Sequence, residues 1–197
     1  SKRRTWLSSQ VLSKESKAIL QGINHKTIIT MGKVGIFFGT STGNTETVAE
    51  KIASAIGDAE LKNVSDGISA ADFESYDNLV LGTSTWGVGD LQDDWESAIG
   101  ELQNANLSGK VVALFGLGDS SSYSDTFVNG MARIYDAVKG NGATVVGAVD
   151  ASDYTYDDSE AVQDGKFVGL AIDEDNESSK TDGRIAAWVA NIKPSFK

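Results

Sequence analysis

The sequence contains no cysteine, one proline (Pro194) and one histidine (His25). Without cysteine the chain has no disulfides, no thiolate nucleophile, no iron–sulfur ligands and no cysteine-ligated zinc. A single histidine near the start excludes a Ser-His-Asp triad in the body of the chain, and it excludes a multi-histidine metal site. The sequence also lacks any run of 18 apolar residues, so we expect no membrane insertion.

Basic residues are scarce after residue 33, where the chain holds ten of them and 27 acids. The whole chain has a net charge of −11. A body this acidic repels nucleic acid and anionic membranes and attracts basic partners. Solubility alone explains the same charge equally well. With 197 residues, the chain has the length of one α/β domain.

Residues 1–32 differ from the rest because they are basic, contain several serines and hold one acid, Glu15. This composition is typical of an organelle transit peptide or its remnant. Alternatively, Met31 is an authentic start and the preceding residues are an artificial addition. We therefore predict a leader over 1–32 outside the fold, and one folded domain over 33–197. The chain is expected to be soluble, in the chloroplast stroma if the leader is a transit peptide and in the cytoplasm otherwise.

Short apolar runs alternate with helical stripes from residue 33 onward. Runs of this length indicate strands buried on both faces, as in a parallel sheet. The predicted strands cover residues 34–38, 59–64, 79–81, 111–115 and 145–149. The helical stripes are Val48, Ile52 and Ile56; Trp95, Ile99 and Leu102; Phe127, Met131, Ile134 and Val138; and Ile185, Trp188, Val189 and Ile192, after which Pro194 ends the last helix.

This alternation predicts an α/β fold with a doubly wound, five-stranded parallel sheet and helices on both faces. Ligands of such sheets bind beyond the carboxyl ends of the strands. That rule selects three loops, at residues 39–45, 83–91 and 116–123.

The first loop joins a strand to a helix N-terminus, where unpaired N–H groups and the helix dipole favour an anion. It lacks the lysine and the spacing of a nucleotide-triphosphate loop. A single capping residue would make an ordinary helix N-cap, but this loop holds four hydroxyl side chains in six residues. We therefore predict a site for one phosphate. The loop reads Thr40, Ser41, Thr42, Gly43, Asn44 and Thr45.

The other two loops each carry an aromatic residue that can stack on a flat ligand. A serine nucleophile in the third loop is excluded because no histidine follows it. One phosphate site and two aromatics at one sheet edge predict FMN, with the ring between Trp86 and Tyr123. The second loop offers Ser84, Thr85, Trp86, Gly87, Val88 and Gly89, and the third offers Leu117, Gly118, Asp119 and Tyr123.

These motifs resemble those of the flavodoxin family from about Lys33 to the C-terminus. The sequence from Thr40 to Thr45 is similar to the family's T-x-T-G-x-T phosphate loop. Trp86 resembles the aromatic of its first ring-stacking loop, and Asp119 and Tyr123 resemble its second. The segment 150–164 resembles the insertion that interrupts the last strand in long-chain members, so we expect that strand to resume over 166–171. By the same analogy, Asp153 approaches the phosphate or the ring edge.

The resemblance implies a low-potential carrier that moves one electron at a time on non-covalently bound FMN, without catalytic residues or a metal. The implied partners are redox proteins with basic docking surfaces, namely photosystem I and ferredoxin–NADP reductase. In that role the protein, a monomer, substitutes for ferredoxin in photosynthesis under iron limitation.

The residues alone leave two alternative functions open. An FMN-dependent NAD(P)H:quinone reductase has the same fold but needs a nicotinamide site, and Arg133 and Arg184 lie on predicted helices. A phosphoacceptor receiver without a cofactor needs acids after the first and third strands, where Gly39-Thr40 and Thr83-Ser84 stand instead.

Overall fold

The computed structural model describes residues 30–197. The predictions for residues 1–29 lie outside the described residues. The compact unit runs from Met31 to Lys197. Met31 packs against the core, and the Gly32 N–H donates to the carbonyl of Lys197. The ordered contacts of the domain therefore begin two residues before the predicted boundary at Lys33.

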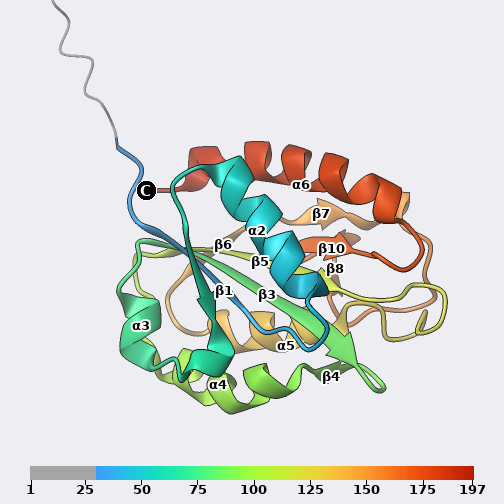
Figure 1. The fold of residues 1–197 in the computed structure, drawn as a ribbon, viewed down its shortest axis with the longest axis horizontal. Coiled ribbons are helices and arrows are strands. Elements are labelled where there is room, and N and C mark those ends of the chain that lie inside the picture. Colours follow the sequence, from blue (N-terminus) through green and yellow to red (C-terminus); the bar gives the residue numbers. More distant parts are fainter. Residues whose placement is uncertain (1–29) are drawn as a thin grey trace, which may run out of the picture. The chain divides into compact units, whose positions relative to one another are not determined.

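The central sheet has five parallel positions, which confirms the predicted topology (Figure 1). Four positions are single strands, and two short strands share the fifth. In spatial order, the strands are β2 (Glu60–Asn63), β1 (Val34–Phe38), β3 (Asn78–Trp86), β5 (Val111–Leu117) and then β6 (Thr144–Val146) together with β10 (Leu170–Ile172). A short strand that was not predicted, β4 (Asp90–Leu91), pairs antiparallel with the end of β3.

The fifth position is interrupted at Gly147. Strand β6 pairs with residues 111–113 of β5, and β10 pairs with residues 115–117. Gly147 has φ +88°, and a Cβ there would lie 2.7 Å from Trp188 Nε1, which donates to the Gly147 carbonyl at 2.8 Å. Only glycine suits that backbone and that close approach. The predicted strand 145–149 therefore ends at Val146.

The inserted residues form a small antiparallel sheet of their own, with the order β7-β9-β8. Its strands are β7 (Val149–Asp150), β8 (Val162–Gln163) and β9 (Lys166–Phe167). Because β9 belongs to this small sheet, the main strand resumes at Leu170 and not at the predicted Lys166. Phe167 is fully buried and holds the insertion to the domain through edge contacts with Tyr154 and Phe127.

Helices cover both faces of the sheet, as predicted (Figure 1). The face that Ile36 and Phe38 occupy is packed by α2 (Asn44–Ile56) and α6 (Ser178–Ile192). Phe37 points to the other face, which is packed by α4 (Asp93–Asn104), α5 (Asn129–Val138) and a short helix that was not predicted, α3 (Ala70–Glu74). Burial on both faces explains why β1 is apolar at every position.

The start of one helix differs from the prediction, and the end of another agrees with it. Helix α5 begins at Asn129, so Phe127 lies just before it and is free to face another neighbour. Helix α6 ends at Ile192, and Pro194 sits in the 3-10 turn Lys193–Ser195 that follows. None of the helices within residues 30–197 combines the length and the apolar character that crossing a membrane requires.

Candidate functional site

A cavity of about 410 Å³ opens beyond the carboxyl ends of β1, β3, β5 and β10. All three predicted loops contribute to it, and the segment after β10 adds a fourth wall. Its lining residues are Thr42, Asn44, Thr45, Ser84, Thr85, Trp86, Gly87, Leu117, Gly118, Asp119, Tyr123, Thr126, Phe127, Glu174 and Asp175. The size is typical of a site for a small organic ligand.

The first turn of α2 borders the cavity, and no side chain caps this end of the helix. Gly43 occupies the N-cap position, and no side chain bonds to the helix from there. Thr40 Oγ1 instead accepts from the Gly43 N–H at 3.0 Å, and Ser41 Oγ accepts from Gln92 Nε2 at 3.2 Å. Thr40, Ser41 and Gly43 therefore shape the loop, while its other three residues line the cavity. An uncapped N-terminus leaves N–H groups available to an anion.

The second predicted loop is mostly strand. Strand β3 continues to Trp86, which pairs with Asp90 of β4, so only residues 87–89 form the turn. Trp86 is 42% exposed, and its Nε1 donates to Ser84 Oγ at 2.8 Å. Val88 at the tip is 82% exposed and does not line the cavity, and neither does Gly89, which packs on Asn129.

The third loop places Asp119 and Tyr123 on the cavity, as predicted. Asp119 Oδ1 accepts from the backbone N–H groups of Ser122 and Ser121 at 2.8 and 3.0 Å. The bond from Ser122 is the main cause that holds the pKa of Asp119 below its ordinary value. The bond from Ser121 and one from the Asn176 side chain lower this pKa further. The loop is therefore organised around an ionised carboxylate.

Four lining residues escaped the sequence prediction. Phe127 was assigned to a helical stripe, but the later start of α5 turns it and Thr126 toward the cavity. Glu174 and Asp175 follow the carboxyl end of β10, the same kind of position that selected the other loops. Strand β10 ends at Ile172, one residue beyond the predicted end at Ala171, and the segment that follows it forms the fourth wall.

The structure does not bring Asp153 to the cavity. Its carboxylate is 80% exposed and lies 3.8 Å from Arg184 Nη2, because the 3-10 turn Ala151–Asp153 projects beside α6. Neither arginine considered for a nicotinamide site lines the cavity. Arg184 pairs with Glu177 and Arg133 with Glu160, at 2.7 and 2.6 Å.

The cavity wall is acidic. Its described lining residues include three carboxylates and no lysine, arginine or histidine. Burial raises the pKa of Asp175, and the neighbouring carboxylates of Asp119, Asp173 and Glu174 raise it further. Among the described lining residues, only neutral N–H and hydroxyl groups are therefore available as donors to an anion.

The sequence model of the Flavodoxin family matches residues 36–188 of the chain. The chain belongs to the flavodoxin family. It is 47% identical to a flavodoxin of Helicobacter pylori and 44% identical to one of Synechocystis, covering 99% and 98% of those proteins with 84% and 83% of its own length.

A solved structure agrees with this assignment. The flavodoxin of Fusobacterium nucleatum, whose crystal structure is described as bound to flavin mononucleotide, superimposes with a TM-score of 0.81 at 34% identity. The superposition covers 85% of this chain and all of that one. Flavodoxins are FMN electron-transfer proteins, so the predicted fold and the electron-carrier class, as opposed to an enzyme, are confirmed at the level of the family.

Proposed function

We propose that the cavity binds FMN non-covalently and that the protein transfers single electrons through it. The observation that carries this proposal is the convergence, on one cavity, of the uncapped N-terminus of α2 and two half-exposed aromatic side chains, Trp86 and Tyr123. The bound flavin supplies the redox chemistry, and the protein supplies binding, orientation and electrostatics.

One further observation fits such a ligand. Thr126 Oγ1 is buried, lines the cavity and has no hydrogen-bond partner among the described residues. A buried hydroxyl without a partner costs free energy, so a ligand with polar ring edges would satisfy it. Thr42, Asn44 and Thr45 then hold the phosphate, Trp86 and Tyr123 stack on the ring, and the backbone of residues 84–87 and 117–119 borders it.

Titration of the purified apo-protein with FMN tests the assignment. We expect stoichiometric quenching of flavin fluorescence and a Kd below about 1 μM, since stacking and charge-assisted bonds act together. Trp86→Leu should raise Kd, whereas Leu61→Ala, which changes an exposed apolar residue on the distant edge strand β2, should not. Absence of binding would contradict the proposal.

The acidic surface defines the partner class in this proposal. Basic docking surfaces complement the carboxylates that surround the cavity, and electrostatic steering speeds such encounters. By resemblance, the partners are photosystem I and ferredoxin–NADP reductase, in photosynthesis under iron limitation. Light-driven NADP reduction by ferredoxin-depleted thylakoids tests this role, because the protein must restore the activity. The proposal assigns this docking role to Asp90, Asp93, Asp94, Asp119, Asp125, Asp157 and Asp158, of which Asp119 lines the cavity.

Two finer assignments complete the proposal. The chain belongs to the long-chain branch, because an insertion with its own small sheet splits the fifth strand. The basic composition of residues 1–32 directs the protein to the chloroplast stroma. Import of a fluorescent protein fused to residues 1–32 into isolated chloroplasts tests the second assignment, with the same fusion carrying neutral residues at Lys2, Arg3 and Arg4 as the control.

A further inference from the structure

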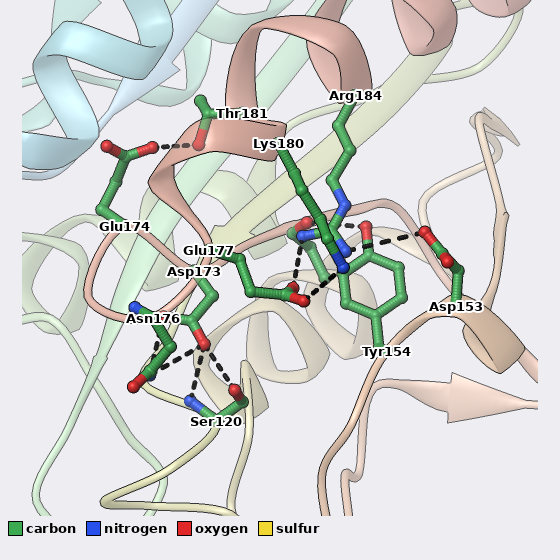
Figure 2. Close-up of polar contacts among 11 residues, drawn as sticks. Ser120, Asp153, Tyr154, Asp173, Glu174, Asn176, Glu177, Lys180, Thr181 and Arg184 are labelled. Atoms are coloured by element: carbon green, nitrogen blue, oxygen red, sulfur yellow. Dashed lines mark hydrogen bonds and ion pairs between the residues drawn. The ribbon is translucent and has the colours of Figure 1, made fainter.

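The segment Asp173–Glu177, called here the acidic turn, connects β10 to α6 and holds four carboxylates and Asn176. Figure 2 shows Asp173, Glu174, Asn176 and Glu177 of this segment. Glu174 and Asp175 line the cavity. Glu177 lies at the other end of the turn, where its carboxylate is 20% exposed and faces α6. The position of one cavity wall therefore depends on what holds this turn in place.

Arg184 of α6 holds the acidic turn from behind. Its Nη1 donates to Glu177 Oε2 at 2.7 Å, and its side chain is 11% exposed. The guanidinium carbon lies 3.9 Å from the ring centroid of Tyr154, so the same group stacks on the insertion (Figure 2). A planar guanidinium can stack on a ring with its face while it donates hydrogen bonds in its own plane.

Hydrogen bonds continue from Glu177 toward the cavity. The Glu177 N–H donates to the Asp173 carbonyl at 2.9 Å, and the buried Asp173 carboxylate accepts from the backbone N–H of Ser120 at 3.1 Å and from its hydroxyl. Asn176 Nδ2 donates to Asp119 Oδ1 at 2.9 Å. The acidic turn and the loop after β5 are thus fixed to each other, and both line the cavity.

A second set of contacts runs through Tyr154. Burial is the main cause that raises the pKa of Tyr154 to about 12. The Tyr154 hydroxyl therefore remains protonated and donates to the Ala171 carbonyl at 2.8 Å. Its ring packs 5.0 Å from that of Phe167 and 6.3 Å from that of Phe127, which lines the cavity. Arg184 therefore joins helix α6, the acidic turn and the aromatic cluster of the insertion.

We propose that Arg184 is a positioning residue for the cofactor cavity, which it orders without touching the ligand. The proposal rests on the proposed binding of FMN. Burial alone would raise the pKa of Glu177, but hydrogen bonds from Lys180 and Arg184 lower it overall. Without the guanidinium, the Glu177 carboxylate keeps only its exposed partner Lys180 and turns with it toward water. That movement displaces the acidic turn, and with it Glu174 and Asp175.

The test compares Arg184→Met with the matched control Lys180→Met, in the full chain. Lys180 also pairs with Glu177, at 2.6 Å, but it is 47% exposed. We expect Arg184→Met to raise the Kd for FMN about tenfold, a typical coupling between sites, and Lys180→Met to change it by less than about twofold. Arg184→Lys should recover only part of the affinity, because it keeps the charge without the planar stacking surface.

Circular dichroism of each apo-protein establishes that the variant is folded before titration. If folded Arg184→Met binds FMN as tightly as the parent chain, the proposal is wrong, even where urea shows a loss of stability. If Arg184→Met does not fold, Glu177→Gln replaces it, and an unchanged Kd again overturns the proposal. Failure of the parent chain itself to bind FMN would instead overturn the proposed function.

Discussion

Gln92, which immediately precedes α4, contacts the loop that follows β1, because its Nε2 donates to Ser41 Oγ at 3.2 Å. The same buried side chain caps α4, since its Oε1 accepts from the N–H groups of Asp94 and Trp95 at 3.1 and 3.3 Å. One amide therefore caps the start of a helix and contacts the loop of residues 40–45. The relationship spans 51 residues of sequence.

Replacing this amide tests both of its roles. Gln92→Ala should lower the free energy of unfolding by about 1–2 kcal/mol, because it removes a helix cap and buried hydrogen bonds. It should also raise the Kd for FMN. Ser41→Ala is the matched control, since it removes the loop contact and leaves the cap intact. Urea unfolding that shows equal losses in both variants would contradict the assigned role of the cap.

Gly87 is the residue whose conformation we expect to matter for the redox properties. Its φ is +52°, and a Cβ there would lie 2.5 Å from Asp90 Oδ2. Glycine allows the turn to reorient its peptide groups at little cost, which a branched side chain prevents. Gly87→Val should bring the two one-electron reduction potentials of the bound flavin closer together and destabilise the fold by about 1–2 kcal/mol.

Potentiometric titration of FMN-loaded protein checks the prediction for Gly87. Val88→Ala is the control, because Val88 is the exposed neighbour in the same turn. Unchanged potentials in Gly87→Val, with normal values in the control, would show that peptide freedom at this turn does not tune the flavin.

Asp175 predicts a dependence of stability on pH. Its pKa is raised in the fold, so between the unfolded and folded pKa values the folded protein binds more protons. As the pH rises through that window, ionisation of Asp175 progressively lowers the free energy of unfolding. Above the folded pKa, this destabilisation stays constant. Asp175→Asn should increase stability at pH 7 by less than about 1 kcal/mol, since water screens an exposed charge.

Thermal unfolding of the apo-protein at several pH values measures this contribution of Asp175. The gain in Asp175→Asn should shrink as the pH falls below the ordinary range of a carboxyl group. Asp58→Asn, at the end of α2 away from the cavity, provides the comparison. A stabilisation that persists unchanged into acid would show that the effect of Asp175→Asn is not ionic.

The acidic surface predicts that electron transfer depends on ionic strength. With a basic redox protein such as cytochrome c as the probe, the rate should fall about tenfold between low and high salt. Neutralising Asp90 and Asp125 together should reduce both the rate at low salt and its salt dependence. Asp58→Asn should leave both the rate at low salt and its salt dependence nearly unchanged. Rates that do not respond to salt would contradict electrostatic docking.

The limits of sequence reading are clear at particular residues. The placement of residues 40–45 and of Trp86 at the carboxyl edge of the sheet was predictable from local order, because a strand must end before α2 and Trp86 fits no helical stripe. Phe127 was not predictable in its role, since its spacing suits a helix that in fact begins at Asn129. The analogy predicts Asp153 near the phosphate or the ring edge, but its exposed carboxylate lies on the side of Arg184, outside the cavity lining.

The sequence by itself determined the parallel sheet, the helices on both faces and the loops at its carboxyl edge, because these depend on periodicity and on residues close together in the chain. The tertiary structure alone decided that Glu174 and Asp175 form a fourth wall, that Gln92 reaches Ser41, and that Arg184 joins α6 to the insertion. Those relationships connect residues about 30 to 130 positions apart, or depend on the register of packed elements, which local patterns do not encode.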